Sequence, residues 1–261
     1  MRFALQLLLA LTLALMGVTG ACSRRDAGGQ HQIKVAAADD LAEPFNEAAR
    51  VFESETGIKV NCTFGPSSEL AKKITHGAVF DLFAADSINE IGKLEKEEQV
   101  ERGTKAMFAQ GRLVLWFPSG AGERIERIED VACTDCGQIG IANPELSLYG
   151  RAAIQALDSM GVLENAASKI VYADNVVQAK QMAVEGRVQG AFLPRSLIKQ
   201  GEGRTIEVDD KSHLPIDNAM AVLKASNKQV AAKKFEVFIL SDRGQELLRQ
   251  HGYERPPVLV N

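Results

Sequence analysis

The sequence predicts an α/β protein with two lobes, each built on a mixed, mainly parallel sheet flanked by helices. Three observations support this class. Short β-like apolar runs alternate with helix-like segments over residues 33–86, and a second alternating set covers residues 112–193. A further strand-like run and two helix-like segments follow in residues 219–252. Alternating strands and helices are typical of parallel sheets with helices on both faces, and two such sets predict two lobes with a cleft between them.

Local signals bound the elements of the first set. Apolar residues at helical spacing end at Gly57, and a second helix begins at Ser67 or Ser68, either of which can cap it, and ends at Gly77. Short apolar or alternating runs between the helices predict strands. The elements expected here are strands at residues 33–38, 58–64 and 80–86 and helices at residues 41–57 and 65–77.

The second set and the C-terminal part follow the same logic. β-branched and aromatic runs predict strands, and segments of helical periodicity between them predict helices. The last helical stretch is broken near Ser241 and Asp242. The elements expected here are strands at residues 112–118, 138–144, 169–175, 190–193 and 219–223 and helices at residues 150–161, 176–187 and, in two parts, 228–252.

The N-terminus carries an export signal. Arg2 precedes an apolar run of signal-peptide length, which is too short and too close to the start for a transmembrane helix. The run ends in the letters VTGAC, which resemble a bacterial lipobox, so we expect residues 1–21 to be removed and Cys22 to receive a lipid anchor in the membrane. Simple secretion is the alternative. Residues 22–31 are polar and contain glycine, and we expect them to tether the lipid to the folded body.

Charge, histidines and cysteines narrow the function classes. The formal net charge of −4 offers no basic footprint for nucleic acid. The four histidines are scattered and no nucleotide-binding, metal-enzyme or nucleophile motif is present, so we expect no cofactor and no bound metal cation. Cys133 and Cys136 form a C-x-x-C in a predicted turn, which in an exported protein favours a local disulfide, with a redox or metal role as the alternative. Cys62 lies in a predicted strand and is expected to be a buried thiol.

Two junctions between strands and helices indicate where a ligand would bind. Ligands of open α/β sheets lie beyond the carboxyl ends of the strands, where helix N-termini offer free N–H groups. The letters AAADD at residues 36–40 and FGPSS at residues 64–68 each join a predicted strand to a predicted helix. We therefore expect polar groups from both junctions to face the same ligand.

These junctions and their neighbours resemble the periplasmic molybdate-binding proteins of ABC transporters. The segment TFGPSSELAKKITHGAVFDLFAAD, residues 63–86, carries most of the resemblance, and the segments IKVAAADDLAEPF and IGIANPELSLYGRAAIQAL also match in order. The resemblance implies a two-lobed type II periplasmic-binding-protein fold. The implied parts are lobe 1 at residues 32–110 plus 223–261, lobe 2 at residues 111–222, and hinge crossings at residues 110–112 and 221–224.

The same resemblance implies a function. The resemblance implies a monomeric, non-enzymatic, extracytoplasmic protein that captures a tetrahedral oxyanion, molybdate or tungstate, and delivers it to an ABC permease. Such sites hold the anion with hydroxyl and backbone N–H groups. Leu193 stands where one branch of the family has a ligand tyrosine, and Tyr149 is the candidate source of a phenol from the opposite side. Carried over by position, the ligand residues are Asp39 or Asp40, Ser67 with Ser68 beside it, Tyr149, and Val176 with Asn175 before it.

An aspartate at the first ligand position conflicts with an anionic ligand. An ionised carboxylate only accepts hydrogen bonds, and at about 4 Å from an anion it repels each unit of charge by roughly 4 kcal/mol at an effective dielectric constant near 20. Asp39 or Asp40 could instead cap its own helix while the backbone faces the ligand. It could also accept a proton from an oxyanion of the hydrogen phosphate or hydrogen arsenate type, which would reject deprotonated anions. Finally, with Asp81 and Asp86, it could attract a cation or a polar organic molecule, although these two residues are also expected to cap or pair structurally.

Two other classes of protein remain as alternatives. An enzyme on the same lobes would use Asp39 or Asp40 as a general base near Ser67. A sensor would signal through protein contact instead of transport. No histidine accompanies Ser67 in the sequence, so we expect this serine to cap a helix and donate to a ligand instead of acting as a nucleophile.

Overall fold

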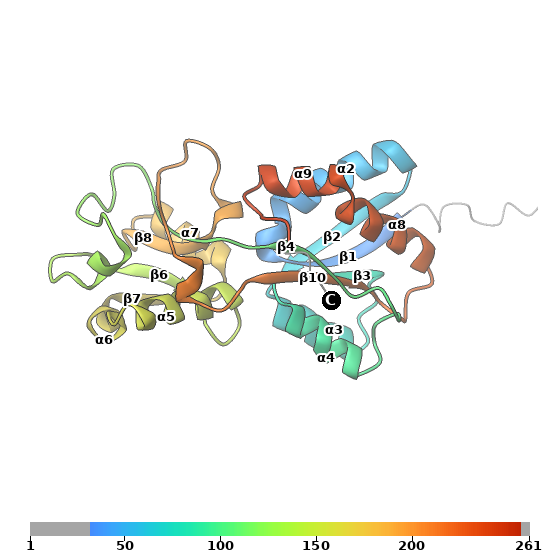
Figure 1. Cartoon of the computed structure of the whole chain (residues 1–261), viewed down its shortest axis with the longest axis horizontal. Coiled ribbons are helices and arrows are strands. Elements are labelled where there is room, and N and C mark those ends of the chain that lie inside the picture. Colours follow the sequence, from blue (N-terminus) through green and yellow to red (C-terminus); the bar gives the residue numbers. More distant parts are fainter. Residues whose placement is uncertain (1–31, 257–261) are drawn as a thin grey trace, which may run out of the picture.

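The computed structural model describes residues 32–256 and divides them into two lobes lying side by side (Figure 1). Each lobe contains a five-stranded mixed sheet, in the order β2-β1-β3-β10-β4 in lobe 1 and β7-β6-β8-β5-β9 in lobe 2. The predicted fold class is therefore confirmed. The signal peptide, Cys22 and the expected tether lie outside the described residues. In the part of the chain that is described, no helix is long and apolar enough to cross a membrane.

Lobe 1 takes both ends of the described chain. Its strands are β1 (Gln32–Ala38), β2 (Lys59–Gly65), β3 (Leu82–Ala85), β4 (Ala106–Gln110) and β10 (Asp217–Val222). Its helices are the 3-10 turn η2 (Asp39–Leu41), α2 (Ala42–Thr56), α3 (Ser67–Thr75), α4 (Ile88–Lys96), α8 (Gln229–Leu240) and α9 (Asp242–Gln250). Gly57 ends α2 in the left-handed conformation, with φ of 69°.

The parallel strands of lobe 1 carry the chain toward lobe 2. Strand β1 pairs in parallel with β2 and β3, so Ala38, Gly65 and Ala85 end at one edge of the sheet. At this edge the chain turns into η2, α3 and α4. The binding junctions predicted at residues 36–40 and 64–68 are therefore neighbours in space.

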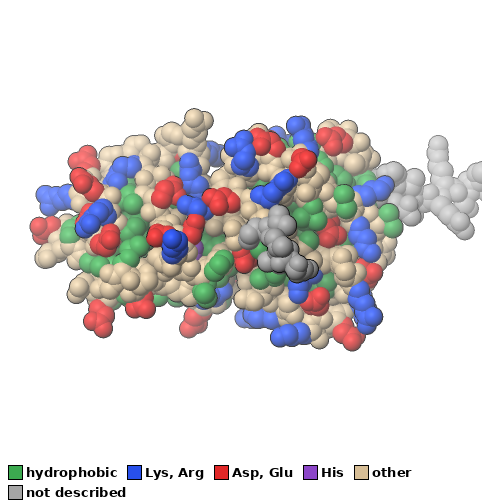
Figure 2. Space-filling model, in the orientation of Figure 1, with side chains coloured by type: hydrophobic (Ala, Val, Ile, Leu, Met, Phe, Trp, Pro, Cys, Tyr) green, Lys and Arg blue, Asp and Glu red, His purple; other side chains and the backbone are tan. Residues whose placement is uncertain are grey.

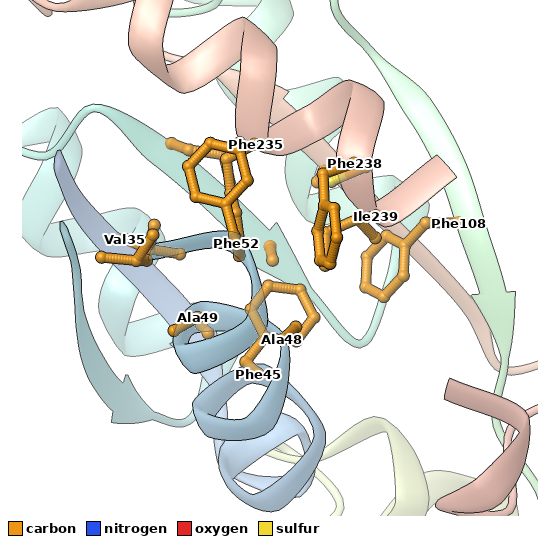
Figure 3. Close-up of a cluster of buried hydrophobic side chains, with 14 of the residues drawn as sticks. Val35, Phe45, Ala48, Ala49, Phe52, Phe108, Phe235, Phe238 and Ile239 are labelled. Atoms are coloured by element: carbon orange, nitrogen blue, oxygen red, sulfur yellow. The ribbon is translucent and has the colours of Figure 1, made fainter. Parts of the chain in front are cut away.

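Aromatic side chains fill the core between the lobe 1 sheet and the helices α2, α8 and α9. Figure 3 shows Phe45 and Phe52 of α2 facing Phe235 and Phe238 of α8, with Phe108 of β4 beside them. The Phe52 and Phe235 rings meet edge to face with centroids 5.2 Å apart. Such pairs add about 0.5–1.5 kcal/mol each to the burial of their area. This packing makes lobe 1 a rigid support for the turns that end its strands.

Lobe 2 is a second sheet with helices on both faces. Its strands are β5 (Leu113–Phe117), β6 (Ile139–Ala142), β7 (Ile170–Ala173), β8 (Gly190–Pro194) and β9 (Arg204–Glu207). Its helices are η3 (Ile128–Ala132), α5 (Leu148–Ser159), α6 (Leu163–Ala166), η4 (Ala167–Lys169), α7 (Val176–Val184), η5 (Arg195–Leu197) and η6 (Asp210–Ser212). Strands β6, β7 and β8 run parallel, and β5 and β9 complete the sheet in antiparallel pairing.

One predicted boundary is wrong. The strand expected at residues 219–223 is β10, and it pairs with β3 and β4 in the sheet of lobe 1. The lobe boundary therefore lies before Asp217 and not at residue 222, and the second hinge crossing lies before β10 instead of at residues 221–224. The first crossing stands where it is expected, between β4 and β5. There the N–H of Gly111 donates to the carbonyl of Ile216 at 2.9 Å, which ties the two crossings together.

The cysteines follow the expectation in part. Cys133 and Cys136 form a disulfide with Cα atoms 5.4 Å apart in the turn before β6. Cys62 is a free thiol that is half-buried in β2, and burial raises its pKa to about 12. A thiol with that pKa is unreactive at neutral pH.

Candidate functional site

A small cavity lies between the two lobes. Its volume is about 10 Å³, which is close to the room that one water molecule needs. None of the residues that line it is a lysine or an arginine. The lining residues are Ala38, Asp39, Asp40, Pro66, Ser67, Asp86, Leu146, Ser147, Tyr149, Asn175 and Val176.

The lobe 1 wall is built where its parallel strands end. After Ala38 the chain turns directly into η2, so Asp39 and Asp40 occupy the first turn before α2. No side chain caps η2 or α2. The interpretation that Asp39 or Asp40 turns back to cap its own helix is therefore wrong, and another arrangement must hold these carboxyl groups.

Asp40 is held by two tyrosines. The Tyr253 hydroxyl donates to its Oδ2 at 2.6 Å and the Tyr149 hydroxyl donates to the same atom at 3.0 Å. The Asp40 side chain is almost fully buried, and burial, together with the charge of Asp86, raises its pKa to about 7. The Ser196 hydroxyl also donates to the Asp40 carbonyl at 3.1 Å. Tyr149 and Ser196 come from lobe 2, so Asp40 is a point at which the two lobes are joined.

Asp39 differs from its neighbour in having free acceptor atoms. It is half-buried, and within residues 32–256 its carboxylate takes part in no hydrogen bond. Burial, together with the charges of Asp86 and Glu69, raises its pKa to about 6. A carboxylate in this position accepts a proton readily as the pH falls toward 6.

Asp86 and Ser67 form a unit on the same wall. The backbone N–H of Asp86 donates to Ser67 Oγ at 3.1 Å. The Asp86 side chain is buried, which raises its pKa, while the Ser67 hydroxyl, the charge of Arg151 and the Leu148 N–H lower it. Asp86 was expected either to cap or pair structurally or to help attract a ligand, and it lines the cavity and raises the pKa of both Asp39 and Asp40.

The lobe 2 wall presents two helix N-termini. Ser147 caps α5 by accepting the N–H of Gly150 at 3.3 Å, and Asn175 caps α7 by accepting the N–H of Gln178 at 2.8 Å. These caps leave the N–H groups of the first turns, including those of Tyr149 and Val176, without a partner inside their own helices. The N-terminal end of a helix favours negative charge, so this wall suits an anion.

Some predicted residues lie elsewhere. Ser68 does not line the cavity, and its hydroxyl donates to the Leu146 carbonyl of lobe 2 at 3.3 Å. Asp81 accepts from the Lys34 N–H at 2.7 Å and from the Ser226 hydroxyl at 2.6 Å, so it is structural and away from the cavity. Leu193 is buried in the core of lobe 2.

Five lining residues and Tyr253 were not among the predicted ligand residues. The five, which lie within a few residues of predicted ones or between them, are Ala38, Pro66, Asp86, Leu146 and Ser147. The serine at the start of α5 carries a cap signal that could have been found. Tyr253 lies 213 positions from Asp40, and no local pattern indicates that contact. In the described residues, no three His, Cys, Asp or Glu side chains are placed to hold a metal ion.

Taken together, two α/β lobes, two crossings and a polar cavity between helix N-termini define a two-lobed solute-binding protein. The family model for the bacterial extracellular solute-binding protein matches residues 33–254. The chain belongs to this family, whose members are extracytoplasmic binding components of transport systems and not enzymes. The general-base role considered for Asp39 or Asp40 is therefore set aside.

Relatives with known names agree with this membership. The molybdate-binding protein ModA of Rhodobacter capsulatus is 31% identical over 224 residues, which cover 85% of this chain and 88% of that protein. YvgL of Bacillus subtilis, by its name an ABC transporter substrate-binding lipoprotein, is 21% identical over 94% of this chain and 95% of its own length. The solved structure of the Azotobacter vinelandii periplasmic molybdate-binding protein superposes with a TM-score of 0.80 at 24% identity, covering 86% of this chain and all (100%) of that one.

Proposed function

We propose that this protein binds a tetrahedral oxyanion of the molybdate or tungstate type in the interlobe cavity and, as a monomer, delivers it to an ABC permease. The observation that carries the proposal is the convergence of η2, α3, α5 and α7 on one cavity without a cationic side chain. Free N–H groups and hydroxyls can surround an anion there. The named relative from Rhodobacter capsulatus supports the choice of ligand.

The carboxyl groups impose a condition on this ligand. A dianion next to Asp39 is repelled as long as the carboxylate is charged. A protonated Asp39 carries an O–H that can donate to the anion. Because its pKa is already about 6 in the empty cavity, protonation near neutral pH takes little free energy. We therefore infer that oxyanion binding is accompanied by proton uptake at Asp39, and that affinity falls as the pH rises above 6.

A second candidate ligand follows from the free acceptor atoms of Asp39. A monohydrogen oxyanion, such as hydrogen phosphate or hydrogen arsenate, could donate a hydrogen bond from its own O–H group to the ionised carboxylate. In that case no proton is taken up, and binding requires Asp39 to be charged. The two candidates therefore predict opposite roles for the same carboxylate.

Calorimetric titration of the mature chain separates the two candidates. Molybdate, tungstate, sulfate, phosphate and arsenate are compared from pH 5 to 8, in two buffers with different ionisation enthalpies so that proton uptake is counted directly. Molybdate or tungstate binding with uptake of about one proton at pH 7 supports the first candidate. Binding of phosphate or arsenate alone, without uptake, supports the second. Failure of all five to bind overturns the oxyanion proposal and leaves the solute-binding family membership intact.

We also propose that Cys22 carries a lipid that anchors the protein to a membrane. The lipobox-like letters and the lipoprotein relative from Bacillus subtilis support this. The mass of the protein purified from membranes should exceed that of residues 22–261 by a diacylglyceryl group, and Cys22→Ser should release it into the soluble fraction. A mature mass without a lipid would contradict the anchor and would leave the binding site unaffected.

A further inference from the structure

Lobe 1 carries an apolar groove that the interlobe site does not use. It lies between α2 and α8, with a volume of about 660 Å³. Phe52 and Phe238, which belong to the aromatic core of Figure 3, reach its floor. Val230 and Val237 line it and are exposed by 74% and 66%. Two valines exposed to this extent on one groove indicate a surface that a membrane or another protein can contact.

Helix α8 is apolar on two sides. Phe235 and Ile239 pack into the core, as an amphipathic helix requires. Val230, Val237 and Leu240 project from the same helix and are exposed. These three side chains are not part of the buried core of lobe 1. They belong to a second, outward apolar face.

Lysines border this outward face. Lys233 and Lys234 line the groove and Lys228 lines the concavity next to it. Lys233 pairs with Glu101 at 3.6 Å, whereas Lys228 and Lys234 form no ion pair with any residue in the described range 32–256. Figure 2 shows Lys and Arg side chains at this end of lobe 1, with hydrophobic side chains among them. Two exposed glutamates near the end of α2, at positions 53 and 55, limit the net charge, so the apolar side chains must supply much of any binding.

The described chain begins beside the groove. Gln32 pairs with Lys59 at the start of β1 and β2, and Ile58 lines the neighbouring concavity together with Val230. Ten peptide steps separate Cys22 from Gln32, and a chain of that length reaches at most about 35 Å. A lipid on Cys22 would therefore hold this end of lobe 1 close to the bilayer.

We propose that the α2–α8 groove and its lysine border form a membrane-contact surface that rests on anionic lipid headgroups. The valines would enter the interface and Lys228 and Lys234 would meet phosphates, as in interfacial helices that combine an apolar face with a basic rim. The anchoring part of this inference rests on the lipid proposed for Cys22. The surface itself does not, because its residues are exposed on lobe 1 whether or not Cys22 carries a lipid.

The test uses the mature chain with Cys22→Ser, so that only the surface can hold it to lipid. Co-sedimentation is measured with vesicles of phosphatidylglycerol and phosphatidylcholine in equal parts, and with vesicles of phosphatidylcholine alone. We expect binding to the anionic vesicles, and the double variant Val230→Asp/Val237→Asp should weaken it by about tenfold or more. The matched control is Val79→Asp/Val184→Asp, which changes two valines exposed by 63% and 61% elsewhere and should bind like the parent.

Three results would overturn the proposal. The parent chain could fail to bind anionic vesicles, or the control variant could lose as much binding as the groove variant. The parent could also form a dimer in sedimentation velocity that the groove variant abolishes, which would make the groove an interface between copies. Oxyanion titration of every variant keeps the two proposals apart, since a folded groove variant should retain the affinity of the parent.

Discussion

The two walls of the interlobe cavity use opposite chemistry. Lobe 1 contributes three carboxyl groups, from Asp39, Asp40 and Asp86, whereas lobe 2 contributes neutral N–H groups at the starts of α5 and α7. The lobe 2 wall suits an anion at any pH. The lobe 1 wall accepts a fully deprotonated anion only when protons reduce its charge, so the comparison identifies the protonation of lobe 1 as the variable to test.

Removing Asp40 should have the largest effect on stability. Asp40→Ala leaves the buried hydroxyl of Tyr149 without its acceptor and opens a small void, whereas the Tyr253 hydroxyl keeps the Asp40 carbonyl at 3.0 Å. We expect the free energy of unfolding to fall by about 3 kcal/mol, because the unpaired buried hydroxyl costs about 1–3 kcal/mol and the void adds to this loss. Chemical denaturation at pH 7 measures this, with Asp158→Ala on the exposed end of α5 as the control. An unchanged stability would mean that the tyrosine bonds do not join the lobes in solution.

The pH should change oxyanion affinity by about 100-fold between pH 6 and pH 8. The pKa of Asp39 is about 6 in the empty cavity, and a bound dianion raises it further. Binding then takes up one proton, and affinity falls about tenfold for each pH unit above 6. In Asp39→Asn this dependence should flatten, with tighter molybdate binding than the parent at pH 8. An equal slope in both proteins would assign the proton to Asp40 or Asp86 instead.

Proton binding also makes the stability of the ligand-free protein depend on pH. Asp40 titrates near pH 7 when folded and near 3.8 in the unfolded chain, so the folded state binds more protons between these values. Stability is therefore greatest at the acidic end of this window and falls as the pH rises through it. We expect the melting temperature to be higher at pH 5 than at pH 7.5, by about 5 °C, and the difference should shrink in Asp40→Asn.

Tyr149→Phe should weaken ligand binding by about tenfold. It removes the hydrogen bond that joins Tyr149 of lobe 2 to Asp40 of lobe 1, and a hydrogen bond to a charged group contributes about 1.5–3 kcal/mol. Tyr172→Phe is the control, because Tyr172 is in the same lobe and is exposed by 55%. Titration at pH 6 measures the ligand affinity of both variants. Equal affinities would mean that the hydrogen bond between Tyr149 and Asp40 does not contribute to ligand binding.

The smallest effect is expected at Ser68. Its hydroxyl donates to Leu146 at the rim and does not face the cavity, so Ser68→Ala should lower affinity by less than about threefold. Ser67→Ala removes a hydroxyl that does line the cavity and should lower it by more than about tenfold. If the two serines prove equal, the lobe 1 wall is arranged differently in the bound state.

The sequence predicted most helices and strands of the two lobes, because the signals for these elements are local. Apolar periodicity and the stop at Gly57 placed α2, and the FGPSS letters placed the start of α3. The β4 strand was missed because five residues of sequence AMFAQ contain no β-branched side chain. The β10 strand was recognised but assigned to the wrong lobe, since a strand pattern does not say which sheet the strand joins.

The residues of the site also divide into those that local sequence signals predict and those that depend on contacts between distant segments. Asp39, Ser67, Tyr149 and Val176 follow from strand ends, helix starts and the family resemblance, and all four line the cavity. The roles of Tyr253 and Ser196 arise only when segments far apart in the chain meet at Asp40. The resulting shift of the Asp40 pKa depends on burial and on Asp86, which no single stretch of sequence contains.

Gly111 gives the two-lobed shape a mechanical consequence. A Cβ at this crossing residue would lie 2.1 Å from the Tyr149 hydroxyl and 2.9 Å from Ile216, so the pivot and the phenol are in contact. In a rotation about the crossings, each atom travels in proportion to its distance from the axis. In such a rotation Tyr149, which lies next to the hinge, would move little. Groups farther from the axis, such as those of α7, would move through larger distances. The contact between Tyr149 and Asp40 therefore lies close to the axis, where a rotation of the lobes changes distances least.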